Sequence, residues 1–343
     1  MIEKTALQDG WELYTVTNTN GMRLKVLNFG GIITSLEVPD KHGNLENVVL
    51  GYRNFKDYQA NPNYFGALIG RVAGRIQNSR FELEGKTYQL EANEGKHHLH
   101  GGPNGFHQVL WKVEPFEENQ ASGLRLSYTS EDGAGGYPGN LQVVVTYTLT
   151  NDNKLVMLYE AATDKETPVT LTNHSYFNLS GNLKKTIAKQ QAMVNSDKFT
   201  ELDEELIASG RWLDTAASPF DLRSFKPLED VFSAPHEQLR IAGEGIDHYF
   251  LFSDEKGPKA GLYDPESGRL MTIESDQPGL VLYTGNGLDE TLELKERMSE
   301  KYLGICFETQ AFPAALHHDG FPSLILRPDE TYRRETVLTF TVK

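Results

Sequence analysis

Two polar segments of the chain carry side chains that could move protons. TNHSYFNL at 172–179 contains His174 and follows an apolar stretch directly, with more hydrogen-bonding groups than a core strand would carry. FETQ at 307–310 places Glu308 at the end of another apolar stretch. Burial there should raise the pKa of a carboxyl group unless nearby charges compensate, and in either case Glu308 is a candidate general base. The simpler interpretations are a polar turn around His174 and a solvent-facing Glu308.

Three histidines lie close together in KHHLHGG at 96–102. If this segment is a strand, alternation places His98 and His100 on the same side, where imidazoles could bind a metal ion. No cysteine pair or His-Glu helix motif accompanies them, so we expect no metal. The two glycines that follow indicate close approach of a ligand to the backbone.

Two further segments offer charged groups. GRVAGRI at 70–76 spaces Arg71 and Arg75 four residues apart, like a phosphate clamp, but it lacks the Gly-Lys-Ser/Thr ending of a phosphate-binding loop. Its guanidinium groups are instead candidates for binding sugar hydroxyls or a carboxylate. GIDHYF at 245–250 contains Asp247, whose carboxylate could hold two adjacent hydroxyls or simply begin a strand.

The elements that must position these residues show the period of β-strands. At 141–150 the apolar side chains alternate with polar ones, and the segments 124–128, 155–161 and 338–342 repeat the pattern. Turn sequences rich in Gly, Asn and Asp separate them. We predict a single all-β domain over 1–343, a sandwich or barrel of antiparallel strands. Helical periodicity is scarce, with a short helix expected at 287–297 and a turn or two of helix at 196–210.

Composition narrows the class of protein. The 343 residues include 48 Asp and Glu against 33 Lys and Arg, a net charge of −15, which disfavours nucleic acid as a partner. The single cysteine, Cys306, allows no internal disulfide. The segment 1–16 lacks the apolar run that a leader would need, so we expect none, and no stretch approaches ~18 uninterrupted apolar residues. These features favour a cytoplasmic protein without a membrane partner.

Six segments, taken in order, resemble the galactose mutarotase (aldose 1-epimerase) family. They are GRVAGRI at 70–76, LHGG at 99–102, TNHSYFNL at 172–179, GIDHYF at 245–250, YTGN at 283–286 and FETQ at 307–310. The resemblance implies a large antiparallel β-sandwich, often called a supersandwich. It implies interconversion of the α and β anomers of an aldose, D-galactose or D-glucose, by opening and closing of the ring. No cofactor is implied.

The resemblance also implies roles for individual residues. Glu308 matches the general base on the C1 hydroxyl, His174 the general acid at the ring oxygen O5, and His100 a histidine that steadies the reacting end. Opposite charges on Glu308 and His174 are expected to stabilise each other. The side chains expected to contact the rest of the sugar are Arg75, Asp247, Asn173, Tyr283 and Gln310.

Two positions depart from the family pattern. Gly74 stands where members usually have Asn, which puts sugar affinity or preference in doubt. Tyr283 stands where some members have Phe, and it keeps an aromatic face for the ring.

Three other functions share parts of this pattern. A hexose-6-phosphate 1-epimerase would need additional cations, to which Arg71 could contribute. A non-catalytic sugar-binding or sensing protein could dispense with the acid–base pair. A glycoside hydrolase or lyase usually needs two carboxylates. The preferred sugar, and whether the protein is a monomer or a homodimer, stay open.

Overall fold

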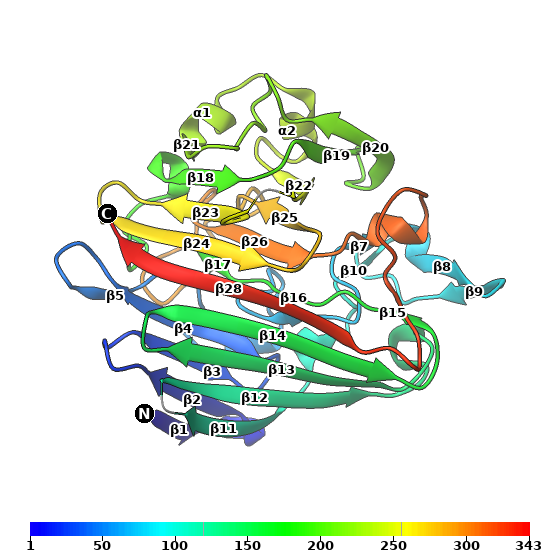
Figure 1. Ribbon diagram of the computed structural model, residues 1–343, viewed down its shortest axis with the longest axis horizontal. Coiled ribbons are helices and arrows are strands. Elements are labelled where there is room, and N and C mark those ends of the chain that lie inside the picture. The colour runs from blue at the N-terminus through cyan, green and yellow to red at the C-terminus, as the bar shows by residue number, and fades with distance from the viewer. Residues whose placement is uncertain (119, 255) are drawn as a thin grey trace.

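The computed structural model describes all residues of the chain except 119 and 255. Its largest element is a nine-stranded antiparallel sheet (Figure 1). In spatial order the strands are β11 (Lys112–Glu118), β12 (Ala121–Ser130), β13 (Leu141–Thr150), β14 (Lys154–Thr163), β28 (Tyr332–Val342), β24 (Arg269–Ser275), β23 (Ala260–Tyr263), β18 (Gln191–Val194) and β21 (Lys226–Pro227). The C-terminal strand β28 therefore lies between β14 and β24, which are far apart in the sequence.

Alternation along these strands follows the prediction. β13 coincides with the predicted strand at 141–150. Its buried residues are Leu141, Val143, Val145, Tyr147 and Leu149, and the residues between them, Val144 included, are not buried. β14 buries Leu155 and Tyr159 in the same way. At the C-terminus Leu338 and Phe340 are buried, but Val342 is exposed because β28 ends at the sheet margin.

A six-stranded sheet faces the first. Its strands, in spatial order, are β17 (Tyr176–Phe177), β26 (Ile305–Gln310), β25 (Gly279–Tyr283), β22 (Asp247–Leu251), β19 (Lys198–Leu202) and β20 (Ala208–Asp214). Leu282 and Phe307 from this sheet share one hydrophobic cluster with Val143 and Leu338 from the nine-stranded sheet. The two sheets therefore form a sandwich, which confirms the predicted all-β class.

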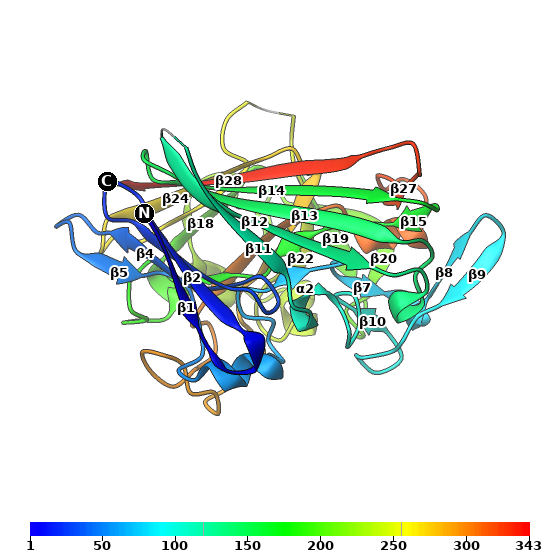
Figure 2. The ribbon, with the colours of Figure 1, turned by 90° about the horizontal axis from the view of Figure 1, so that it is seen from below.

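The N-terminal third adds a five-stranded antiparallel sheet, and several short strand pairs complete the fold. The sheet consists of β1 (Ile2–Ala6), β2 (Glu12–Thr17), β3 (Arg23–Leu27), β4 (Ile32–Pro39) and β5 (Leu45–Asn47). The pairs are β7 (Arg75–Ile76) with β10 (His98–Leu99), β6 (Leu68–Ile69) with β16 (Thr172–Asn173), β8 (Arg80–Leu83) with β9 (Lys86–Gln89), and β15 (Thr167–Pro168) with β27 (Ile325–Leu326). Seen from below, β7 and β10 lie to one side of the layer formed by β13, β14 and β28 (Figure 2).

Both helix predictions are wrong. The segment 287–297 is a chain of turns and isolated bridges, in which Asp289 accepts hydrogen bonds from Thr291 and so competes with helix formation. The segment 196–210 contains β19 and the start of β20, because Phe199 and Leu202 are buried through pairing with neighbouring strands.

The α-helices of the described residues lie elsewhere, at α1 (Leu228–Phe232) and α2 (Glu237–Ile241). Both are too short for their apolar period to be visible in the sequence. None of the described helices has the length and apolar character needed to cross a membrane.

Candidate active site

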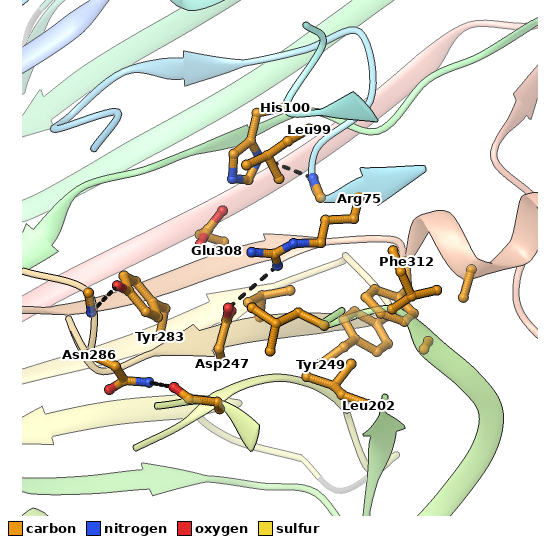
Figure 3. Close-up of a pocket in the computed structure, with 18 of the residues that line it drawn as sticks. Arg75, Leu99, His100, Leu202, Asp247, Tyr249, Tyr283, Asn286, Glu308 and Phe312 are labelled. Atoms are coloured by element: carbon orange, nitrogen blue, oxygen red, sulfur yellow. Dashed lines mark hydrogen bonds and ion pairs between the residues drawn. The ribbon is translucent and has the colours of Figure 1, made fainter. Parts of the chain in front are cut away.

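A cavity of about 400 Å³ opens beside the six-stranded sheet, where β22, β25 and β26 approach the β7–β10 pair (Figure 3). The predicted residues that line it are Arg75, His100, His174, Asp247, Tyr283 and Glu308. They come from six separate regions of the sequence. Sheet pairing brings them together, since β26 pairs with β25 and β25 pairs with β22.

Glu308 and His174 face each other at the buried end of the cavity. Glu308 lies on β26, opposite Val281 of β25, and its side chain is 3% exposed. Its Oε1 lies 3.4 Å from Nε2 of His174, while its Oε2 has no hydrogen-bond partner within the described chain. His174 is held by its backbone, whose N–H donates to the carbonyl of Ala67 at 2.9 Å. The predicted acid and base are thus in contact.

Burial shifts the pKa values of this pair in opposite directions. Desolvation and the charge of Asp247 raise the pKa of Glu308 well above its usual range, against a lowering effect of Arg75. Desolvation lowers the pKa of His174 to about 4. The predicted rise for Glu308 is confirmed in direction. Burial opposes the expected ionised pair, however, and favours one shared proton that lies on the carboxyl group.

His100 presents a hydrogen-bond donor to the cavity. Its Nδ1 accepts a hydrogen bond from the backbone N–H of Gly74 at 3.1 Å. Burial lowers its pKa well below the usual range, so the ring is neutral and its proton lies on Nε2. A left-handed backbone at His100, with φ of 53°, and a closely packed Gly101 fix the position of the ring.

The ligand atoms of His100, His174 and Glu308 lie within 4.8 Å of one another, which is close enough for a metal ion. An imidazole binds a metal ion through a free lone pair on a ring nitrogen. In His100 the lone pair of Nδ1 accepts the hydrogen bond from Gly74 and Nε2 carries the proton, so neither nitrogen is free. These three residues therefore fit a metal poorly. His98 lies apart, with its ring between the carbonyl of Glu91 and the hydroxyl of Tyr137, so it does not join His100 in a common site.

Arg75 is clamped between two carboxylates. Glu94 accepts hydrogen bonds from its Nε at 2.6 Å and its Nη2 at 3.0 Å. Its Nη1 lies 3.4 Å from Oδ2 of Asp247 (Figure 3). These two carboxylates and Glu308 outweigh desolvation and raise the pKa of Arg75. The guanidinium and Asp247 together present fixed donors and acceptors to the cavity.

Tyr283 forms part of the cavity wall next to Glu308 (Figure 3). Its hydroxyl accepts a hydrogen bond from the backbone N–H of Gly287 at 2.8 Å. Its ring packs edge-on against Tyr176, with the centroids 5.8 Å apart. The ring is therefore held in place with one face available for packing.

Asn173 and Gln310 lie behind the cavity wall. The amide of Asn173 donates to the carbonyl of Gly66 at 2.8 Å and to the hydroxyl of Tyr147 at 3.2 Å. Nε2 of Gln310 donates to the carbonyl of Ala73 at 3.3 Å. Neither is among the lining residues. Their positions do not support the expected sugar contacts and place them instead as supports for the loops that carry His174 and Gly74.

Gly74 and Arg71 are explained by packing. Gly74 has φ of +88°, and a Cβ there would lie 2.9 Å from Cγ of Pro313. Pro313 therefore occupies the space that the side chain of a larger residue at position 74 would need. Arg71 is buried and donates to the carbonyls of Ser130, Glu131 and Pro138. It belongs to the core and is no part of a phosphate clamp.

Sequence reasoning missed two residues of the site. Tyr64 lines the cavity with its ring between those of His100, His107 and His174, at centroid distances of 4.8, 4.8 and 5.8 Å. Glu94 holds Arg75 from an adjacent loop. Neither residue belongs to a motif. The one feature of the sequence that could have indicated them is their position in turn sequences that precede buried segments.

The chain is similar to known proteins over nearly all of its length. The family model described as aldose 1-epimerase matches residues 12–339. Galactose mutarotases from Sus scrofa and Homo sapiens are each 40% identical over 94% of this chain and 92% of their own length. The aldose 1-epimerase of Escherichia coli K12 is 31% identical, over 96% and 95%.

Solved structures show the same fold. A galactose 1-epimerase from Lactobacillus acidophilus superposes with a TM-score of 0.88 at 29% identity, covering 100% of this chain and 98% of that one. An aldose epimerase homologue from C. elegans superposes with a TM-score of 0.87 at 28% identity, covering 96% and 98%.

Proposed function

Because this chain belongs to the aldose 1-epimerase family, it is an isomerase that acts on an aldose, and we propose that Glu308 and His174 interconvert the α and β anomers of D-galactose and D-glucose. The observation that carries the assignment of these two residues is their buried contact of 3.4 Å at the end of the cavity. A carboxyl group and an imidazole at hydrogen-bonding reach of C1 and O5 are what ring opening requires.

The reaction needs one proton removed and one delivered. Glu308 takes the proton of the C1 hydroxyl while His174 gives a proton to O5, so the C1–O5 bond breaks and a free aldehyde forms. After rotation about C1–C2 the transfers run in reverse, and the ring closes on the other face. The pair holds the same single proton before and after, so no co-reactant is consumed.

Burial favours the shared proton on Glu308, and the sugar reverses this preference. Hydroxyl groups that donate to the carboxylate stabilise its charged form, and Arg75 already lowers the pKa of Glu308. The proton then moves to Nε2 of His174, which becomes the acid. The Nε2–H of His100 faces the same end and is placed to hold the ring oxygen or the C1 oxygen.

A phosphorylated hexose fits this cavity less well. Arg75 is the one Lys or Arg among the described lining residues, and Glu94 and Asp247 already balance its charge. A phosphate group would bring further negative charge beside Glu308 and Asp247. Neutral sugar hydroxyls avoid this repulsion.

Polarimetry on freshly dissolved α-D-galactose, α-D-glucose and a hexose 6-phosphate, with and without the protein, tests this proposal. We expect faster relaxation to an unchanged final rotation for the two neutral sugars and no acceleration for the phosphate. Acceleration of the phosphate alone would overturn the substrate assignment. No acceleration of any sugar would leave the pocket as a binding or sensing site.

A further inference from the structure

Both ring nitrogens of His174 have a neighbour. Nε2 faces Oε1 of Glu308 at 3.4 Å, and Nδ1 lies 3.5 Å from Sγ of Cys306. The rings of Tyr64 and Tyr176 lie within 30° of the plane of the imidazole, at centroid distances of 5.8 and 5.1 Å, and so restrict its tilt. Of the two groups in contact with the ring nitrogens, only Glu308 takes part in the proton transfers. The contact with Cys306 has no role in them.

Strand β26 presents both of these groups to the imidazole. Cys306 and Glu308 are two residues apart on β26, and side chains two residues apart on a strand point to the same face. Cys306 pairs with Tyr176 of β17, and His174 lies two residues before Tyr176. The pairing that brings His174 next to Glu308 therefore also places Nδ1 beside the sulfur, and both Cys306 and His174 are buried there.

The thiol of Cys306 is neutral, because desolvation and the charges of Glu308 and Asp247 raise its pKa well above the usual range. A neutral thiol is both a weak donor and a weak acceptor. If it donated to Nδ1, the ring proton of His174 would lie on Nε2 and would meet the proton of Glu308, which the carboxyl group retains because burial raises its pKa. The sulfur therefore accepts from Nδ1–H, and the lone pair of Nε2 faces the proton of Glu308.

Resting on the proposed function, we propose that Cys306 is a positioning residue of the reaction, whose sulfur keeps a proton on Nδ1 of His174 and so directs the lone pair of Nε2 at Glu308. A half-turn of the ring about its Cβ–Cγ bond would place carbon atoms where the two nitrogens lie, and a proton on Nε2 would block transfer from Glu308. Nδ1–H keeps the same partner when the ring becomes an imidazolium. Acid–base pairs commonly include a third group that orients the imidazole.

Cys306→Ala and Cys306→Ser separate the hydrogen bond from the packing, because both side chains are smaller than cysteine and only serine can accept from Nδ1–H. Polarimetry over a range of D-galactose concentrations gives kcat and KM. We expect Cys306→Ala to lower kcat about five- to tenfold, the worth of one hydrogen bond, with KM little changed. Cys306→Ser should keep kcat within about twofold of the wild type, because the hydroxyl restores the acceptor. Equal losses in the two variants would show that Cys306 acts through packing and would overturn the proposal.

Ile305→Val is the matched control, because Ile305 is also fully buried on β26 but points to the opposite face and pairs with Phe177. Its kcat should equal that of the wild type, although its packing is also disturbed. A loss of kcat as large as that of Cys306→Ala would contradict the proposal.

Nitrogen-15 NMR of the histidine-labelled protein measures the tautomer without reference to the rate, and His174→Asn identifies the signals of His174. In the wild type we expect a proton on Nδ1 and none on Nε2, and in Cys306→Ala a shift of the proton toward Nε2. A wild-type Nδ1 without a proton would overturn the proposal and leave the proposed function intact. If the wild type accelerates neither D-galactose nor D-glucose, the proposed function itself fails, and the NMR spectrum alone decides the role of Cys306.

Discussion

At the residue scale, the proposed mechanism depends on one proton shared by two buried groups, Glu308 and His174. Desolvation pushes the pKa of Glu308 up and that of His174 down, and the two atoms that exchange the proton lie 3.4 Å apart. His100 differs because its Nδ1 is already engaged by Gly74, so it acts as a donor only. The three side chains thus have distinct roles, set by their neighbours.

Replacing Glu308 with Gln keeps the shape of the side chain and removes the proton acceptor. We expect kcat to fall by about 10²–10⁴-fold with the thermal unfolding temperature little changed, and His174→Asn to act similarly. Polarimetry and circular dichroism measure the two effects. Glu293→Gln, at an exposed ion pair with Arg53, serves as the control and should keep full activity. A near-normal rate for Glu308→Gln would remove this residue from the mechanism.

Glu94 acts through Arg75. Glu94→Gln keeps one acceptor but loses the charge and the second strong hydrogen bond, so Arg75 turns further toward Asp247 and both are less available to the sugar. We expect KM to rise several-fold with a smaller change in kcat, measured by initial rates over a range of sugar concentrations. An equal fall in kcat with unchanged KM would show that Glu94 does not act by positioning the binding groups.

At the element scale, a short loop between β9 and β10 controls two parts of the site. Its Glu94 holds Arg75, and its Asn93 accepts a hydrogen bond from the backbone N–H of Leu99 at 2.7 Å, next to His100. The chain then turns at Gly101, where φ is +85°. Close packing of this turn against Gly70 fixes the backbone that carries His100.

Gly101→Ala tests the importance of this turn. A Cβ at Gly101 would lie 1.9 Å from the carbonyl oxygen of Gly70, whereas Gly133 has the same φ of +85° and no atom within 4 Å. Gly133→Ala should cost about 1–2 kcal/mol of unfolding free energy through its left-handed backbone alone. Gly101→Ala should cost more and should also lower activity. Urea unfolding and polarimetry compare them, and equal effects would contradict the role of the close approach.

At the scale of the whole molecule, one hydrophobic cluster runs from Tyr14 to Phe340 and includes strands of all three large sheets. From this continuity we propose that residues 1–343 form one domain. Several histidines are buried in or beside this interior, and burial lowers the pKa of His107 to about 4 and that of His248 to about 3. Folding therefore keeps these rings neutral.

This burial predicts acid sensitivity. Between about pH 6.5 and 3 the unfolded chain binds a proton at His248 that the folded chain does not, so the unfolding free energy falls as the pH falls through this window. His248→Gln should reduce the slope by up to about 1.4 kcal/mol per pH unit. Urea unfolding between pH 7 and 4 measures it. The exposed His42→Gln is the control, and an identical slope in both variants would contradict the prediction.

The sequence by itself determined several of the strands and the candidate catalytic residues. Alternation along 141–150 is a local property, so it predicted β13 to the residue, and the motifs around His174 and Glu308 identified the pair. Periodicity failed at 287–297 and 196–210, because turn hydrogen bonds and pairing with distant strands decide those segments.

Only the tertiary structure decided which of those residues are in contact and how each is protonated. The pairing of β17 with β26 brings His174 next to Glu308, and burial then favours the position of their shared proton. Contacts between segments far apart in the sequence decide three further features of the site. Glu94 holds Arg75, Gly74 fixes the tautomer of His100, and hydrogen bonds to other loops hold Asn173 and Gln310 behind the cavity wall. Such contacts leave no local pattern in the sequence, because each of them forms only when distant strands hold the two backbone segments close together.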